Sequence, residues 1–418
     1  MVQVSRDPRS LATFKSNPHP GLSGPDRYLE PARGGAVAKV TLTEAGKSVA
    51  ATPLAVAVDL LRADVPPRIV DAPEDWPRWN TMLAHVLAAT KYFDVLASRA
   101  ELHGELSIQV SWLVERSGTY LKARGQLKAA LAVMERAVAI AQITDGPTHP
   151  SVAARLNSVA GILRDLGDLP AAREMIERAL RIAEETHGED HAEVAPHLVT
   201  LAQVLRSLGE RIEARIAAER ALEITRRTQG VHHPDVVPRL TELSLIVRDL
   251  EDPTTARAHA EQAVDIAEQV HGCHHPTVAL ALHALALAVL DQGDPSSART
   301  LAERALTIDE SVYGEHHPIT AIRLNNLAWI LYTLKEPITA RQLVERALRI
   351  HLSNQSPNHS FVAIASDTLA CILSDLGEVD LAAETSLQAL ALAEETLGSQ
   401  HPTTELIRGT VTRLTSGS

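Results

Sequence analysis

A strict period of 42 residues runs through most of this chain and constrains its fold more than any other feature. Histidine recurs at this spacing, at 149, 191, 233, 275, 317, 359 and 401. Alanine keeps the same period at 172, 214, 256, 298, 340 and 382, and again at 179, 221, 263, 305, 347 and 389. Self-similarity of this kind is the signature of a stacked repeat array, which excludes a mixed globular fold.

One unit, residues 149–190, is predicted to form two helices. Leu156, Val159, Ala160 and Leu163 lie at i, i+3, i+4 and i+7, which is the spacing of an apolar stripe along a helix. Gly167 then ends the first helix. A second stripe follows at Leu169, Ala172, Ile176, Ala179 and Leu180. Alanines let helices approach closely, and one pair cannot bury its stripe alone, so each unit must stack on its neighbours. The sequence therefore predicts an all-α solenoid of antiparallel helix pairs.

The order of small residue, glycine, alanine and alanine at Ala160, Gly167, Ala172 and Ala179 is similar to the tetratricopeptide repeat, or TPR. The usual TPR unit has about 34 residues, and this one has 42. With histidine–proline at its start, Leu-Asn-Asn-Leu-Ala at 324–328 and Glu-Arg-Ala-Leu at 345–348, the longer unit resembles the kinesin light chain variety. The resemblance extends from about residue 107 to the C-terminus. It implies a right-handed superhelical solenoid whose first helices line a concave groove.

The remaining segments are predicted to flank this array. Residues 1–52 are rich in proline, glycine and charge, so we expect them to be disordered or loosely packed. Residues 53–106 are predicted to form a helical lead-in, in which Trp76 and Trp79 cover the first layer of the array. Seven units fill residues 107–400, and residues 401–418 supply a C-terminal capping helix. The segment 76–90 also resembles the lead-in to repeat arrays at the C-termini of bacterial STAND-type NTPases.

Composition narrows the classes of partner and the compartment. The net charge of −12 argues against nonspecific binding of nucleic acid. Cys273 and Cys371 lie far apart and suggest a reducing cytoplasm rather than a disulfide framework. The N-terminus lacks the apolar core of a signal peptide, and no stretch approaches the roughly 18 apolar residues of a membrane span. We expect a cytoplasmic protein without nucleic-acid or membrane partners, and the alanine- and arginine-rich composition favours a bacterial origin.

Two motifs that could indicate a ligand site have simpler explanations. Gly46-Lys47-Ser48 matches the last three residues of the phosphate-binding loop motif. The motif also needs glycine at the position where this chain has Thr41. The histidine pairs at 232–233, 274–275 and 316–317 fall one to each junction between units and lack clustered carboxylate or cysteine partners. A structural role at the junction is therefore favoured over a metal site, and we predict neither a metal nor a cofactor.

No cluster of residues breaks the periodicity as an active site would. Glu177-Arg178 recurs in register as Glu219-Arg220 and Glu303-Arg304, which indicates solvated or inter-repeat ion pairs. Glu251 and Lys335 replace the glycine between the two helices of their units, where we expect strained or altered ends to the first helix. We predict no catalytic residues.

Candidate partner-binding residues lie off the apolar stripe on the first helix of each unit. Positions equivalent to 157, 161 and 164 share one face of that helix, and by the TPR resemblance this face lines the groove. The predicted partner-binding residues are Lys122, Asn157, Arg164, Gln203, Arg206, Arg248, His283, Asn325, Trp329 and Tyr332. The position equivalent to 164 is basic as far as Arg248 and then becomes Leu290, Tyr332 and Ser374, so one half of the groove is basic and the other is apolar and aromatic.

A row of cations in an acidic chain calls for negative partners. These are either intramolecular carboxylates such as Asp165 and Asp249 or acidic residues of a bound protein. The leading interpretation is a non-enzymatic scaffold that binds a peptide or domain of another protein in the groove. The alternative is the sensor array of a STAND-type signalling NTPase whose catalytic part belongs to another chain. A third, weaker hypothesis places a hydrolase or nucleotide-binding function in residues 1–106.

Overall fold

The computed structural model describes residues 53–66, 69, 75–97, 105–353, 359–399 and 401–415, together with the backbone of 26–28 and 39–41. The chain divides into two compact units, residues 1–67 with 75–117 and residues 68–74 with 118–418. Most of the segment expected to be disordered or loosely packed, including Gly46-Lys47-Ser48, lies outside the described residues.

Within its described residues, the first unit contains two short strands and two complete helices. Strands β1 (Asp26–Tyr28) and β2 (Lys39–Thr41) pair antiparallel. Helices α1 (Pro53–Asp64) and α2 (Trp76–Ala97) pack on each other, and α3 (Glu105–Ala123) begins in this unit. Trp76 and Trp79 of α2 are both buried. These helices fall where the sequence predicts a helical lead-in.

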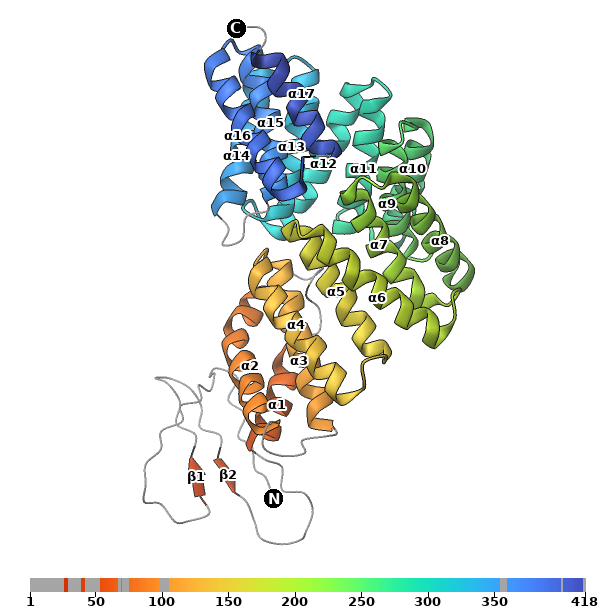
Figure 1. Cartoon of the computed structure of the whole chain (residues 1–418), viewed down its shortest axis with the longest axis vertical. Helices are drawn as coiled ribbons and strands as arrows, with labels where there is room; N and C mark the ends of the chain where they lie inside the picture. The colour runs from red at the N-terminus through yellow and green to blue at the C-terminus, as the bar shows by residue number, and fades with distance from the viewer. Residues whose placement is uncertain are drawn as a thin grey trace. The chain divides into compact units, whose positions relative to one another are not determined.

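The second unit is a succession of helix pairs that can be followed in Figure 1 from yellow through green to blue. After α3, the first helices of the pairs are α5 (Pro150–Leu166), α7 (Ala195–Leu208), α9 (Val236–Asp249), α11 (Pro276–Asp291), α13 (Pro318–Thr333) and α15 (His359–Asp375), with α17 (Pro402–Thr415) at the end. The second helices are α4 (Leu127–Thr144), α6 (Leu169–His187), α8 (Arg211–Gln229), α10 (Pro253–His271), α12 (Pro295–Tyr313), α14 (Pro337–Ser353) and α16 (Val379–Leu397). A single 3-10 turn, η2 (Ala192–Val194), precedes α7.

Successive first helices pack directly on one another in several places, which puts them on the inner side of the array's curvature. Such contacts join α5 to α7, α7 to α9, α9 to α11, α13 to α15 and α15 to α17. We therefore call the first helix of each pair an inner helix and the second an outer helix. The predicted all-α solenoid of antiparallel helix pairs is confirmed over the described part of the second unit.

The recurring small residues form the contacts between helices. Ala160, Ala172 and Ala179 of one unit are all 0% exposed, and their equivalents in the later units are at most 1% exposed. Because these side chains add so little bulk, larger residues such as Ile176 fill the remaining space, and one connected core extends from Ala202 to Ile372. Among the described helices, none combines the length and apolar character needed to cross a membrane.

The inner helices end in a residue with left-handed backbone conformation. Gly167 and Gly209 do so with φ of 90° and 83°, where the absence of a side chain makes the conformation accessible. Glu251 and Lys335 adopt the same region, with φ of 63° and 64°. The expected strain is confirmed at both positions, since a side chain there costs about 1–2 kcal/mol.

The junction histidines accept backbone hydrogen bonds at the starts of the units, which confirms their predicted structural role. Four of them, His149, His275, His317 and His401, stand directly before an inner helix, whereas His191 caps the turn η2. The imidazole Nδ1 accepts a hydrogen bond from the backbone N–H two residues later, over 3.1–3.2 Å, at His149, His191, His233, His275, His317 and His401. The ring also stacks on the last residue of the preceding outer helix in three units. These pairs are His187 with His191, His271 with His275 and Tyr313 with His317. In this hydrogen bond the ring nitrogen Nδ1 is the acceptor, so it takes the place of the side-chain oxygen of a usual N-cap residue.

The outer helices carry the Glu–Arg register seen in the sequence. Within an outer helix, an arginine lies 2.7 Å from the glutamate four residues later in Arg173–Glu177, Arg215–Glu219, Arg257–Glu261, Arg299–Glu303 and Arg341–Glu345. Between units, Arg220 pairs with Glu184 and Arg346 with Glu310, both at 2.8 Å. The predicted solvated and inter-repeat ion pairs are confirmed.

Candidate partner-binding face

The face predicted to line a groove is formed by side chains of the inner helices, and we call it the inner face. It comprises the positions equivalent to 154, 157, 158, 161, 164 and 165, which fall on one side of a helix because they are three, four or seven residues apart. Ten residues of this face were predicted to contact a partner. The structure divides them between a charged stretch, a buried polar contact and an aromatic pair.

The charged stretch begins with a chain of hydrogen bonds between α3, α5, α7 and α9. Lys122 Nζ lies 3.7 Å from Asp165 Oδ2, and Arg164 donates to Asp165 Oδ1 through Nε at 3.0 Å and Nη2 at 2.6 Å. Arg164 also donates to Gln203 Oε1, and Gln203 Nε2 donates to Glu242 over 3.2 Å. Burial acts to raise the pKa of Asp165, but Arg164 and Lys122 outweigh it and hold the pKa below its ordinary value.

The chain continues from α7 to α11. Arg206 lies 2.9 Å from Glu242 and 3.4 Å from Asp249, and Arg248 pairs with Asp291. Burial acts to lower the pKa of Arg206, and Glu242 and Asp249 together raise it. The network thus joins four cations to four carboxylates, with zero formal charge in all: Lys122, Arg164, Arg206 and Arg248 with Asp165, Glu242, Asp249 and Asp291. Of the two alternatives for the basic row, the structure shows intramolecular carboxylates.

The predicted polar residues His283, Asn325 and Asn157 differ in how far they are buried and in the contacts they make. His283 Nδ1 lies 3.3 Å from Asn326 Nδ2. Burial, reinforced by the nearby Arg323, Arg248 and Arg206, lowers the pKa of His283 well below its ordinary value, so this ring is neutral. Asn325 is only 5% exposed, whereas Asn157, at the same position of its own unit, is partly exposed. Of the two adjacent asparagines of α13, the one available on the inner face is therefore Asn326, which the sequence analysis did not select.

The aromatic pair lies on α13. Trp329 is 39% exposed, and its ring centroid lies 5.4 Å from that of Tyr332. The ammonium of Lys335 lies 5.7 Å from the Tyr332 ring. Two further apolar side chains on this face were missed by the sequence analysis: Ile364 of α15, 40% exposed, and Leu406 of α17, 69% exposed. They are 42 residues apart, so the repeat register could have revealed them.

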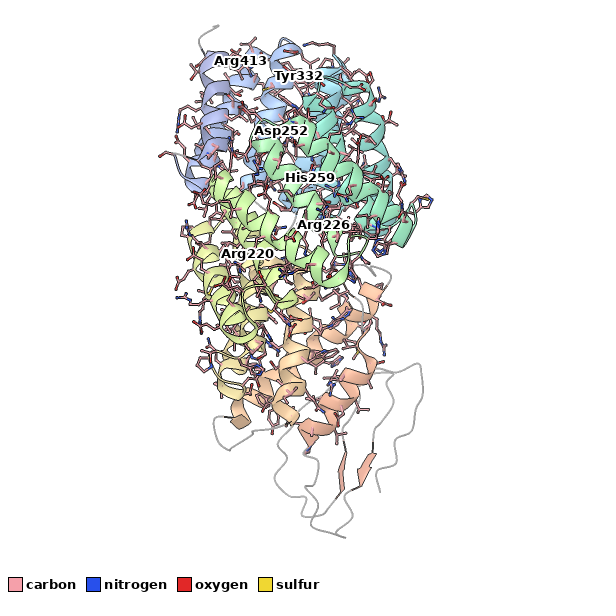
Figure 2. All side chains as sticks on the ribbon, turned by 90° about the vertical axis from the view of Figure 1, so that its right-hand side faces the viewer. Arg220, Arg226, Asp252, His259, Tyr332 and Arg413 are labelled. Atoms are coloured by element: carbon pink, nitrogen blue, oxygen red, sulfur yellow. The ribbon has the colours of Figure 1, made fainter. Side chains whose placement is uncertain are left out.

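A polar cluster joins α15 to α17 beside the aromatic pair. Arg413 donates to Cys371 Sγ over 3.3 Å, and Thr410 lies 3.5 Å from Asp367. Burial raises the pKa of Asp367 to about 6 and also raises the pKa of the Cys371 thiol, which is therefore protonated and unreactive. Figure 2 shows Arg413 close to Tyr332, at the same end of the array.

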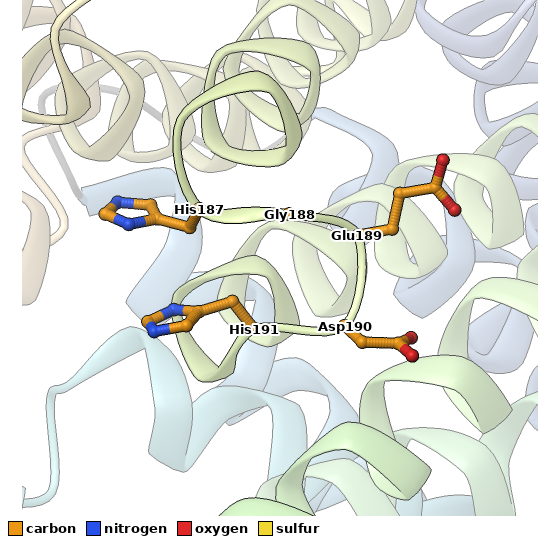
Figure 3. A pocket seen from close by; sticks show the side chains of 5 residues that line it. All are labelled: His187, Gly188, Glu189, Asp190 and His191. Atoms are coloured by element: carbon orange, nitrogen blue, oxygen red, sulfur yellow. The ribbon is translucent and has the colours of Figure 1, made fainter.

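A depression at one junction is lined by His187, Gly188, Glu189, Asp190 and His191. Figure 3 shows the two imidazoles on one side of the loop and the two carboxylates on the other. Asp190 pairs with Arg227 at 3.2 Å, so its carboxylate serves the contact with the next outer helix. Within the described ranges, no group of three or more His, Cys, Asp or Glu side chains is placed to hold a metal ion.

Comparison with known proteins gives a consistent family match. Two models of the tetratricopeptide repeat match this chain, one at residues 152–227, 237–311 and 298–353 and the other at 118–151 and 362–403. No curated protein matches the chain.

Many solved structures are similar to it, among them the three that follow. A Rap protein complexed with competence and sporulation factor is 12% identical, with a TM-score of 0.52 over 87% of this chain and 98% of that one. The apo form of RapI is 17% identical, with a TM-score of 0.50 over 68% of this chain and 99% of that one. The nearly identical TPR-like repeats of a putative kinesin light chain from Podosopora anserina are 25% identical, with a TM-score of 0.39 over 48% of this chain and 96% of that one.

Proposed function

Because the chain belongs to the tetratricopeptide repeat family, whose arrays are typically non-catalytic scaffolds, we propose that it binds a segment of another protein on its inner face. The proposal is of a scaffold without catalytic residues, cofactor or metal. A Rap protein of the same general fold has been solved with competence and sporulation factor, and that complex supports a ligand-binding role for such an array.

The observation that carries the proposal is the exposed apolar surface at the C-terminal end of the inner face. Trp329, Ile364 and Leu406 are exposed on three successive inner helices. Tryptophan and tyrosine are enriched among residues that dominate binding energy, because they bury a large area at low entropic cost. Exposed apolar side chains at the same face of successive helices favour a binding site there.

The charged stretch limits how strongly an acidic partner can bind, because its cations are already paired with carboxylates of this chain. An acidic partner would have to displace Asp165, Glu242, Asp249 and Asp291 from cations that they already neutralise. We therefore place the principal contact at the aromatic pair and infer a partner segment whose main anchor is an apolar side chain. Acidic residues of the partner are then secondary contacts along the charged stretch.

A photo-crosslinking experiment tests this assignment. A benzophenone amino acid at position 329 is expected to capture a partner protein from native lysate. The same group at Ile338, which is 67% exposed on the outer helix α14, serves as the matched control. With the captured partner in hand, Trp329→Ala should weaken binding by about 2 kcal/mol with little change in salt dependence, and Ile338→Ala should leave affinity unchanged. Equal capture from both positions would place the binding surface elsewhere.

A further inference from the structure

The loops that join inner to outer helices in early units contact the starts of units far away in the sequence. His317 Nε2 lies 2.7 Å from the carbonyl oxygen of Ala123, and His401 Nε2 contacts the carbonyl oxygen of Ser207. Each pair is 194 residues apart. The contact between His401 and Ser207 is equivalent to that between His317 and Ala123, shifted by two units along the chain. The contact therefore follows the period of the array.

Prolines and glycines complete these contacts. A Cβ added to Gly125 would lie 2.9 Å from Pro318 Cγ, and one added to Gly209 would lie 2.8 Å from Pro402 Cδ and Cγ. Between them, a Cβ on Gly167 would lie 3.6 Å from Ser360 Oγ. Three successive loops thus meet three successive unit starts. We call this set of residues the turn clasp: Ala123, Gly125, Gly167, Ser207 and Gly209 on one side, and His317, Pro318, Ser360, His401 and Pro402 on the other.

The sequence of the loops matches the clasp. All three clasped loops have glycine at the left-handed position, where a side chain would meet the opposing unit. The two exceptions to glycine, Glu251 and Lys335, fall in later loops. The remaining later loops have Gly293 and Gly377, and a Cβ on either would have nothing within 4 Å. Residues other than glycine therefore occur at the left-handed position only in loops outside the clasp, although Glu251 and Lys335 are strained there.

The two clasp histidines use both ring nitrogens. In His317 and His401, Nδ1 accepts the capping bond from their own helix and Nε2 donates to a carbonyl of a distant loop. Both bonds together require the neutral ring with its proton on Nε2. Burial lowers the pKa of both side chains. The hydrogen bonds to Ala123 and Ser207 act in the opposite sense but are outweighed, and Arg124 at His317 and Arg211 at His401 add to the lowering. The net shift favours the neutral ring in both histidines.

We propose that the turn clasp is a reversible latch, which holds the array closed on itself and parts to admit a helical or folded partner to the inner face. Among the described residues, the clasp contains two hydrogen bonds to carbonyls and a few apolar contacts, whereas one connected core joins the units from Ala202 to Ile372. It can therefore open without unfolding any helix pair. The consequence for partner access rests on the proposed function, but the latch itself does not.

The latch is tested by a variant, called the wedge variant, in which added methyl groups force the two sides of the clasp apart. Gly125→Ala with Gly209→Ala places a methyl group against Pro318 and Pro402. The matched control is Gly293→Ala with Gly377→Ala, which imposes the same left-handed strain where the Cβ meets nothing. In small-angle X-ray scattering we expect the wedge variant to have a larger radius of gyration than the control, with equal helix content by circular dichroism. Superimposable scattering curves for the two variants would overturn the latch.

A second pair of variants serves if the wedge variant does not fold. His317→Asn with His401→Asn keeps a side-chain oxygen for the cap but removes the donor that reaches the distant carbonyl. His149→Asn with His233→Asn changes two junction histidines outside the clasp, each of which also accepts a hydrogen bond from the backbone N–H two residues later. Expansion in the first pair alone supports the latch, and equal dimensions in both pairs contradict it.

Access to the inner face is measured without any partner. Leu245 of α9 is partly exposed at a position equivalent to 161, so Leu245→Cys in a Cys273→Ser, Cys371→Ala background gives one reactive thiol on this face. We expect a maleimide carrying a large polyethylene glycol chain to react about tenfold faster in the wedge variant than in its control, while iodoacetamide reacts at similar rates in both. Equal rates for the large reagent would contradict the gating of access, whatever the outcome of the crosslinking experiment at Trp329.

Discussion

Arg323 of α13 and Asp309 of α12 form an ion pair of 2.8 Å in which the side chains are 8% and 1% exposed. Burial raises the pKa of Asp309, although Arg323 opposes the shift. Removing one partner leaves the other charge buried and unpaired, so Arg323→Met should lower the free energy of unfolding by about 3–5 kcal/mol. The double variant Arg323→Met, Asp309→Leu removes both charges and should recover most of the loss. Urea denaturation monitored by circular dichroism measures both, and a double variant no more stable than the single one would contradict the explanation.

The ion pairs of the inner and outer helices should differ in their contribution to stability. Arg206→Ala leaves Glu242, whose side chain is 9% exposed, without its charged partner, so we expect a loss of about 1–3 kcal/mol. Arg215→Ala breaks an exposed pair with Glu219 on α8 and should change stability much less than Arg206→Ala does, because solvent screens exposed ion pairs. Combining Arg206→Ala with Glu242→Ala should restore part of the loss, since alanine occupies the equivalent position 284. Equal effects of the two single variants in urea denaturation would count against the inner-face network.

Relief of backbone strain should stabilise the array at two loops. Glu251→Gly and Lys335→Gly place glycine where φ is 63° and 64°, and each should raise the free energy of unfolding by about 1 kcal/mol. Glu251→Ala is the control, because it removes the charge and keeps a Cβ. The urea midpoint of the glycine variants should rise while that of the alanine variant stays close to the original; a rise in the alanine variant as well would point to charge rather than conformation.

The stability of the array should fall on mild acidification. Burial lowers the pKa of His197 and His351 to about 4, from an ordinary value of 6.5. Below pH 6.5 the unfolded chain takes up protons that the folded chain does not, until the pH approaches 4, so the free energy of unfolding decreases through this window. Asp367, whose pKa is raised to about 6, acts in the opposite sense.

A double variant isolates the two histidines. His197→Leu with His351→Leu removes both groups, leaves Asp367 unchanged, and should make the fall in thermal midpoint between pH 7 and pH 4.5 shallower. A variant at the exposed His274 is the control and should follow the original curve. If the double variant has the same pH slope as the original chain, other groups control the acid sensitivity.

The framework of the fold was predictable because it depends on local spacing. Ala160, Ala172 and Ala179 and their equivalents in the later units mark the contacts between helices, and they are buried as expected. The junction role of the histidines was also predictable. Their capping bond could have been predicted as well, since four of them stand directly before the proline that opens a helix.

The inner face was only partly predictable. Asn157 and Asn325 occupy the same position of the repeat, yet the first is partly exposed and the second is buried. The position lies at the border between the inner face and the core, where the size of neighbouring side chains decides exposure. The turn clasp could not be predicted, because the contact between Ala123 and His317 depends on small rotations between units that accumulate along the array.

The clasp histidines have a consequence for how arrays of this kind can change length. His317 and His401 close the array with a residue that recurs at each junction, and the loops they meet likewise follow the repeat pattern. Insertion or deletion of one 42-residue unit would therefore change which residues form the contact. A histidine of another unit would then meet the equivalent loop of another unit. The clasp thus depends on residues that recur in the repeat rather than on particular positions of the chain. Arrays of different length can therefore keep a clasp even when the residues of their inner faces differ.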